Sequence, residues 1–184
     1  MNINLFGILE EEQDINNDNN LVIQKEKEYM DYINKHIQRV IEAYNKLRHI
    51  DFGDDEINRG FLDLGPEIED HDKSKFSDEE FDYYRIKFYP VSDVEQEDID
   101  ELFEKAWDHH YKVNPHHPEH YWNKELGTSE DMPAKYIAEM ICDWYSFGDA
   151  YKWWNNNPDG REKKSKIMSP HTLRLTEKII EKIK

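Results

Sequence analysis

The residues best suited to chemistry in this chain are histidines and aspartates, and they are unevenly spaced. The chain contains 9 histidines, five of which fall between residues 109 and 120. His71 and Asp72 are adjacent, whereas His36 and Asp143 stand alone in other segments. Imidazole nitrogens and carboxylate oxygens together suit zinc, manganese, iron and related divalent ions. The combination predicts a metal site without a thiolate framework, since Cys142 is the only cysteine.

Helical patterns must position these side chains. Apolar residues recur at intervals of three and four over residues 22–49, which predicts one long helix with His36 on its apolar stripe. Ser77 and Glu80 have the spacing of a capping box, so a helix is predicted over residues 78–89. A further stripe over residues 99–110 ends at His110, with His109 at its margin. The first and third of these helices therefore bring candidate donors to the core or to its edge, and the His71-Asp72 pair lies just before the second.

Further helices and loops are predicted in the rest of the chain, and one of these helices carries another candidate donor. A helix predicted to begin near Pro133 carries Asp143 beside its buried face and Glu139 one turn earlier, and Ser169 with Pro170 is predicted to open the last helix. Residues 50–67 contain three glycines and a proline and are interpreted as a connection. Residues 113–133 contain three prolines and are predicted to form a long loop, which in a compact domain is often functional.

Composition favours one helical domain. The chain has 184 residues, with only 7 glycines and 7 prolines and no regular alternation of apolar and polar residues. We therefore expect an all-α bundle of about five to seven helices over residues 23–184. Residues 1–22 form a polar, acidic segment that is expected to be mobile.

Charge and hydropathy limit the binding partners and the cellular locations that we expect for the protein. The formal net charge of -17 argues against polymeric nucleic acid, and the absence of a long apolar run argues against a signal peptide or a membrane span. A cytoplasmic location is expected, which would be the host cytoplasm for a phage protein. The sequence does not determine whether the protein forms an oligomer.

At these residues the chain resembles the HD-domain superfamily of metal-dependent phosphohydrolases. Its pattern is a histidine on one helix, an adjacent His-Asp pair and a distant aspartate, present here as His36, His71 with Asp72, and Asp143. The chain also resembles a small, mostly phage-borne HD-like family with HDxSKFS, W-x-HHY, NPHH and EMICDW-like segments, found here at residues 71–77, 107–111, 114–117 and 139–144. The resemblance covers roughly residues 25–150. The GYP tripeptide of the HD-GYP branch is absent, which argues against cyclic di-GMP hydrolysis.

The resemblance implies an HD-like helical bundle and a phosphohydrolase acting on a small phosphorylated metabolite, with a nucleotide as the leading candidate. It implies one divalent ion or two, of manganese, cobalt, magnesium, zinc or iron. Asp72 and Lys75 are the candidate catalytic residues, and Lys75 is also a candidate phosphate contact. The candidate metal ligands are His36, His71, Asp72, His110 and Asp143, with His109, His116 and His117 as further candidates for ligands or for substrate contacts.

Plainer interpretations compete with these roles. His36 alone would suit an ordinary core histidine, and Lys75 an ordinary surface lysine. Tyr111, Tyr121 and Trp122 would suit stacking on a nucleobase or packing of the loop on the core. Two other classes of function also remain open, an HD-type di-iron oxygenase and a non-enzymatic acidic protein that mimics DNA or binds a host protein.

Overall fold

The structure is a computed structural model that describes the backbone of residues 5–96 and 99–184, and side chains from residue 19 onward apart from residues 94, 97 and 98. It confirms the all-α class. The α-helices are α1 (Leu5–Leu47), α2 (Asp55–Leu64), α3 (Phe81–Phe88), α4 (Ile99–Val113), α5 (Ala134–Ser146), α6 (Ala150–Asn156), α7 (Pro158–Ser165) and α8 (Pro170–Lys182). Short 3-10 turns are η1 (Ile68–Asp70), η2 (Lys73–Phe76), η3 (Val94–Gln96) and η4 (Pro118–Tyr121).

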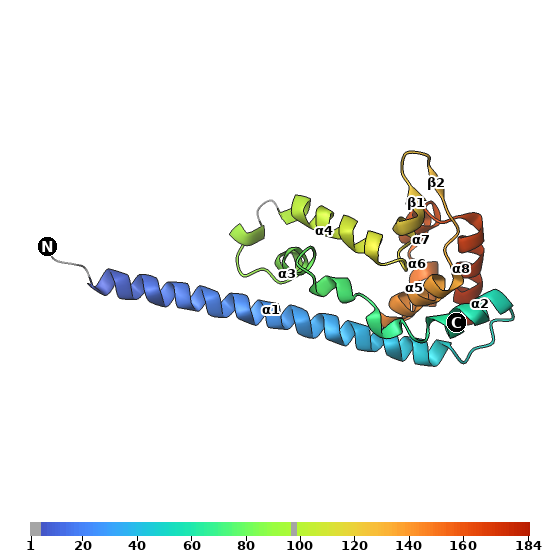
Figure 1. Ribbon diagram of the computed structural model, residues 1–184, viewed down its shortest axis with the longest axis horizontal. Coiled ribbons are helices and arrows are strands. Elements are labelled where there is room, and N and C mark those ends of the chain that lie inside the picture. Colours follow the sequence, from blue (N-terminus) through green and yellow to red (C-terminus); the bar gives the residue numbers. More distant parts are fainter. Residues whose placement is uncertain (1–4, 97–98) are drawn as a thin grey trace.

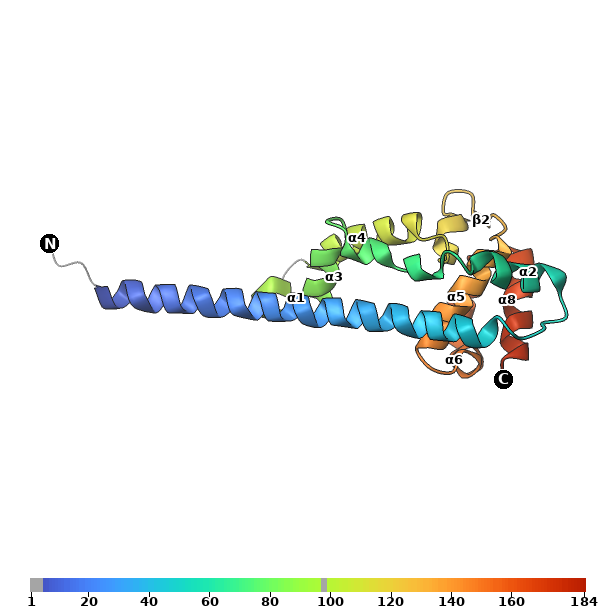
Figure 2. The ribbon, with the colours of Figure 1, turned by 60° about the horizontal axis from the view of Figure 1, so that its bottom comes forward.

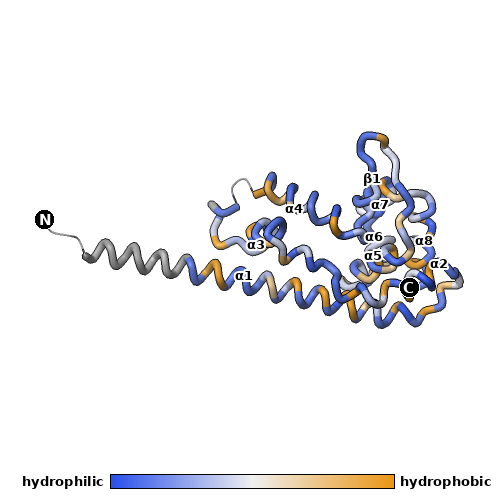
Figure 3. The backbone as a smooth tube through the Cα atoms, in the orientation of Figure 1, coloured by the Kyte–Doolittle hydropathy of each residue, from blue (hydrophilic) through white to orange (hydrophobic). Residues whose placement is uncertain are grey.

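Helix α1 runs along one side of the molecule, and its first turns extend beyond the other elements (Figures 1 and 2). It begins at Leu5 rather than near residue 22, so residues 5–22 of the acidic segment predicted to precede the domain belong to this helix. The mobility of that segment stays a prediction, and residues 1–4 lie outside the described part. Apolar residues recur along the described side chains of α1 (Figure 3), as the sequence pattern predicted.

The core has two apolar clusters that meet at α1. The larger cluster joins the C-terminal half of α1 to α2, α5, α6 and α8, and includes Val40 and Leu47. The smaller cluster joins Tyr29, Ile33 and Ile37 of α1 to α3 and α4. His36 lies on the same buried stripe, between Ile33 and Val40, and is 2% exposed. The histidine is therefore held where the two clusters adjoin.

The interpretation of residues 50–67 as a connection is wrong, because this segment contains α2. Asp54 caps the helix by accepting hydrogen bonds from the backbone amides of Glu56 and Ile57. Gly60 faces α5 so closely that a Cβ atom there would lie 2.6 Å from the backbone of Ala134. The three glycines of this segment led to its interpretation as a connection. Gly60 lies within α2, where the absence of a side chain lets this helix pack closely on α5.

The capping box predicted at Ser77 and Glu80 is also wrong. Helix α3 begins at Phe81 without a side-chain cap, three residues later than expected. Glu80 is fully buried and points its carboxylate at histidines of α4. The spacing matched the capping motif, but tertiary contacts take the carboxylate elsewhere.

The predicted loop between α4 and α5 contains η4 and a small antiparallel hairpin. Its strands β1 (Trp122–Asn123) and β2 (Thr128–Ser129) pair Trp122 with Ser129 and Asn123 with Thr128. The last helix agrees with its predicted start, because the Ser169 side chain accepts a hydrogen bond from the Thr172 amide. Among the described residues, no helix is long and apolar enough to span a membrane.

Gly60→Ala should destabilise the protein by about 1–3 kcal/mol, because the added methyl group must push apart α2 and α5. Leu62→Ala on the same helix is the matched control, since Leu62 is 65% exposed and its truncation should cost less than about 0.5 kcal/mol. Urea unfolding of both variants measures the difference. Equal stability of the two variants would contradict the close-packing role.

Candidate metal centre

One group of donors lies where α1, η1, η2 and α5 meet. The Nε2 atoms of His36 and His71 lie 3.4 Å apart. Asp143 Oδ1 lies 3.1 Å from His36 Nε2 and 3.7 Å from His71 Nε2. These three residues form one buried or half-buried set whose donor atoms lie close enough together to share an ion. Residues from three separate segments are thus brought to one point.

A second group lies against the end of α4 and the turn that follows it. His110 Nε2 and His116 Nε2 lie 3.3 Å and 3.5 Å from Asp72 Oδ1, and His117 Nε2 lies 3.0 Å from His110 Nε2. His110 and His116 are almost fully buried. Asp72, His110, His116 and His117 therefore form a second compact donor set.

Asp72 joins the two groups. Its Oδ2 atom lies 3.4 Å from His36 Nε2 and 3.6 Å from His71 Nε2, whereas its Oδ1 atom faces the second group. The backbone of Asp72 has φ 56° and ψ 15°, a left-handed conformation that side chains other than glycine, asparagine and aspartate rarely adopt. Such conformations concentrate at functional sites, where surrounding contacts hold them. Here the conformation places a carboxylate between two sets of histidines.

The donor chemistry and spacing fit a divalent ion. Ligand atoms about 2.0–2.2 Å from one ion lie roughly 3.0–3.5 Å apart in octahedral or tetrahedral shells. The donor distances in both groups lie in or near this range. Within the described part of the chain, the buried atoms Asp72 Oδ1, Asp143 Oδ1 and His116 Nε2 make no hydrogen bond. Their close approach without hydrogen-bond geometry is what lone pairs directed at a shared cation would produce.

Two buried glutamates orient the histidines from behind. Glu139 Oε1 lies 2.9 Å from His71 Nδ1 and 3.3 Å from His116 Nδ1, so it contacts one histidine of each group. Glu80 Oε2 lies 2.8 Å from His110 Nδ1. A carboxylate on Nδ1 places the proton there and leaves Nε2 free as a donor to metal. This is the arrangement expected of imidazoles prepared for coordination.

Charge coupling keeps the carboxylates ionised. Burial opposes ionisation of Asp72, but the nearby His71 and Lys75 outweigh it and hold the pKa of Asp72 well below its ordinary value. Burial likewise opposes ionisation of Glu139, yet hydrogen bonds from His116 and His71 lower its pKa to about 2. Burial disfavours the charged form of His71, but Asp72, Asp143 and Glu139 raise its pKa to about 10. In the metal-free protein His71 therefore supplies positive charge that a metal would replace.

Lys75 extends this site toward the surface. Its Nζ atom lies 2.5 Å from Asp72 Oδ2, and its side chain is only 16% exposed. Lys75 therefore places a positive charge beside the bridging carboxylate, at the side that faces the first donor group. This position agrees with the sequence-based hypothesis that Lys75 contacts a phosphate, although that role stays a prediction.

The other candidate residues take different positions relative to the two donor groups. His109 turns to Glu80, with its Nδ1 atom 2.8 Å from Oε1, and lies outside both donor groups. His116 and His117, predicted as ligands or substrate contacts, lie within the second donor group. Glu139, which the sequence placed one turn before Asp143, lies against histidines, while Lys135 pairs with Glu67. Glu80 was missed because its spacing from Ser77 suggested a cap.

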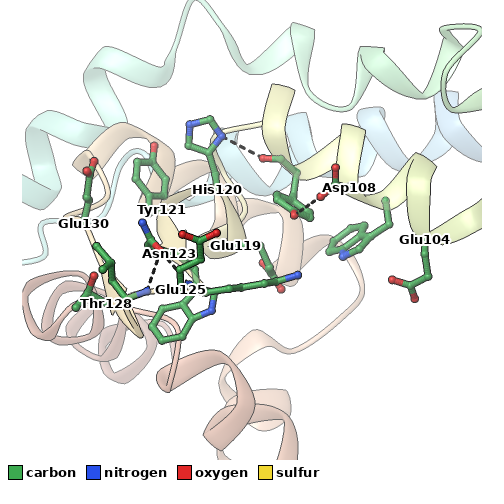
Figure 4. A pocket seen from close by; sticks show the side chains of 14 residues that line it. Glu104, Asp108, Glu119, His120, Tyr121, Asn123, Glu125, Thr128 and Glu130 are labelled. Carbon is green, nitrogen blue, oxygen red and sulfur yellow. Dashed lines mark hydrogen bonds between the residues drawn. The ribbon is translucent and has the colours of Figure 1, made fainter.

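A large cavity is lined by residues of α4, of η4 and of the β1–β2 hairpin (Figure 4). Its volume is about 730 Å³, and we call it the acidic cavity. Trp107 in its wall stacks near His110 and meets the edge of His117, which connects the cavity to the donor group. Its acidic lining residues are Glu104, Asp108, Glu119, Glu125 and Glu130.

The described residues form an all-α protein with buried histidine and carboxylate groups that could hold a metal ion. Residues 25–182 match the family of unknown function DUF5662, and the chain belongs to this family. The comparisons with curated proteins and with solved structures found no match. Because the family description names no activity, function must be inferred from the site.

Metal binding should release protons. At about pH 8 His71 in the metal-free protein is protonated, because its pKa is raised to about 10, whereas a coordinated imidazole is neutral. We expect at least about one proton released per ion, and metal affinity that rises with pH between about 6.5 and 10. Titration calorimetry in two buffers of different ionisation enthalpy measures this number. Proton release near zero at pH 8 would rule out His71 as a ligand.

Glu139→Gln should weaken metal binding by about 10–100-fold, because a neutral amide orients and polarises His71 and His116 less well than a carboxylate. Glu67→Gln is the control, since Glu67 is exposed and pairs with Lys135 away from the donor groups. Equilibrium dialysis with manganese or zinc measures both affinities. Equal affinities in the two variants would contradict a supporting role for Glu139.

Proposed function

We propose that this protein is a divalent-metal-dependent phosphohydrolase of the HD type, acting on a small phosphorylated metabolite, with a nucleotide as the proposed substrate. One observation carries the proposal. Asp72 presents its two oxygens to two histidine groups while Lys75 lies against the same carboxylate. Side chains that could hold a metal ion and a lysine that would receive a phosphate group therefore lie close together.

The donor chemistry supports hydrolysis. A divalent ion held by His36, His71, Asp72 and Asp143 would coordinate a phosphate oxygen and bring the pKa of a bound water molecule near neutrality. The four residues would supply two neutral nitrogens and two carboxylates, whose two negative charges formally balance one divalent ion, so Lys75 would supply the positive charge that offsets the phosphate. Asp72 would also orient the attacking water, through lone pairs of its carboxylate that do not bind the metal.

Lys75 supplies charge where a phosphate needs it. Its ammonium group would donate to a phosphate oxygen and stabilise the negative charge that develops in the transition state. On a protein of net charge -17, this lysine and the metal would form a local exception to a repulsive surface. Small phosphate esters that reach the centre are accordingly favoured over polymeric nucleic acid.

A second function remains a candidate because Asp72 lies between two donor sets. A pair of iron ions bridged by this carboxylate would suit an HD-type di-iron oxygenase that cleaves C–C or C–P bonds. Metal analysis of the purified protein discriminates the two. Two irons per chain with an oxygen-dependent product favour the oxygenase, whereas phosphate release without oxygen favours the hydrolase.

The proposed activity is tested by a screen of metal-supplemented protein against nucleoside mono-, di-, tri- and cyclic phosphates. Phosphate release with manganese or cobalt, lost on chelation, is the expected result. No release from any ester with any of the five proposed metals would contradict the proposal.

Asp72→Asn should reduce both bound metal and turnover to background, because it removes the charge shared by the two donor groups. Asparagine tolerates the left-handed backbone and has nearly the same volume, so the fold should survive. Asp70→Ala is the matched control, since Asp70 is exposed and pairs with Lys73. Metal content by elemental analysis and phosphate release are measured together, and retained activity in Asp72→Asn would refute the assignment.

A further inference from the structure

A second cavity is lined in part by Lys75, the lysine that contacts Asp72. It has a volume of about 430 Å³, which lies in the range of small-molecule sites. We call it the aromatic cavity, and its lining residues come from α1, η2 and the end of α3: Tyr29, Tyr32, Lys75, Tyr84, Phe88 and Tyr89. Five of the six carry aromatic rings and the sixth is the lysine that contacts Asp72.

The aromatic cavity is continuous with the donor residues. Lys75 Nζ lies 2.5 Å from Asp72 Oδ2 and 5.6 Å from the centre of the Tyr84 ring. Tyr32 lies nearly parallel to the His36 ring at 6.4 Å, and its other neighbour is Tyr89 at 6.2 Å. A ligand in this cavity would therefore have its aromatic walls on one side and the lysine and donor groups on the other.

We propose that the aromatic cavity binds the planar ring of the substrate, a nucleobase, while Lys75 receives the phosphate at the cavity's inner end. The inference rests on the proposed phosphohydrolase function and names the substrate class of that site. It assigns the ring to the tyrosines of α1 and α3, whereas the sequence had offered the aromatics between residues 111 and 122.

Polar groups in the cavity wall favour a heterocycle over an alkyl chain. The hydroxyls of Tyr29 and Tyr84 are buried and make no hydrogen bond within the described part of the chain. A buried hydroxyl without a partner is costly, and a ring with acceptors on its edge would satisfy one. Tyr32 and Phe88 are 37% and 57% exposed, so aromatic faces are available for stacking at the mouth.

Charge distinguishes the two cavities. The lining of the acidic cavity includes five carboxylates and Lys124. Lys112 and Lys164 pair with two of those carboxylates, but acidic groups still outnumber basic ones there. The lining of the aromatic cavity contains Lys75 and no carboxylate. Lys75 pairs with Asp72, so a metal ion held by Asp72 would leave the lysine's charge available to a ligand. With that ion bound, a phosphate monoester would be repelled from the first cavity and attracted to the second.

Photolabelling tests the assignment without turnover. Manganese-loaded protein is irradiated with 2-azidoadenosine 5′-monophosphate, and the labelled peptides are mapped by mass spectrometry. Label on residues 29–32 or 84–89, suppressed by unlabelled AMP, is the expected result. Label confined to residues 104–130, or no label that AMP suppresses, would overturn the proposal.

A matched pair of ligands separates the ring from the phosphate. AMP and ribose 5-phosphate carry the same phosphate, so a change in the ring site should alter the affinity for AMP alone. We expect Tyr32→Ala to weaken AMP binding about 10-fold, within the range for loss of base stacking, and to leave ribose 5-phosphate binding unchanged. Trp122→Ala, in the wall of the acidic cavity, is the control and should change neither affinity. Equal loss for both ligands, or a loss of AMP affinity only in the control, would overturn the proposal.

Tyr84→Phe tests the hydroxyl while keeping the ring, and it should weaken AMP binding without weakening ribose 5-phosphate binding. Failure of this inference and failure of the proposed function give different results. Labelled tyrosines without phosphate release would refute hydrolysis and leave the ring site standing. Phosphate release with label elsewhere would refute the ring site and leave hydrolysis standing.

Discussion

The structure depends on the burial of one carboxylate, that of Asp72, among imidazoles from three directions. A buried charge is costly unless it is paired, and here His36, His71, His110 and Lys75 all approach it. The left-handed backbone of Asp72 is held because these contacts over-determine the position of its side chain. The two apolar clusters on either side hold the helices rigidly in place, and this packing offsets the free-energy cost of bringing the charged side chains together.

Each of the two buried glutamates contacts two histidines, which links the donor residues both by contact and by charge. Glu139 contacts a histidine of each group, and Glu80 contacts the adjacent histidines His109 and His110. Glu139 raises the pKa of His71 and Glu80 raises the pKa of His110, so each carboxylate favours the charged form of one histidine when no metal is bound. A disturbance at one glutamate is therefore transmitted to two imidazoles. Among the described residues, the candidate metal centre is one network of nine side chains, the seven donors of the two groups and the two glutamates, rather than a set of independent ligands.

The position of the cavities follows from the same arrangement. Helices α1, α3 and α4 enclose the smaller cluster, and Lys75 reaches Asp72 from the turn between η1 and α3. The aromatic cavity thus opens beside the smaller cluster, whereas the acidic cavity lies under the hairpin beyond Trp107. The two cavities differ in the charge of their linings, because the acidic cavity has five carboxylates in its wall whereas the aromatic cavity has Lys75 and no carboxylate.

Periodicity and motif spacing alone determined the helical class, a long first helix, the last helix with its Ser169 cap, and the inward position of His36 and His110, because burial of an apolar stripe is a local property of the pattern. Local rules failed where tertiary contacts override them. Glu80 directs its carboxylate to His110 instead of capping α3, and Gly60 permits close packing on Ala134. The burial of His71 and His116, and the division of the donors into two groups around Asp72, were decided only by the tertiary structure. Distances between side chains as far apart in the sequence as those of His36 and Asp143 depend on how helices pack, and no spacing along the chain encodes them.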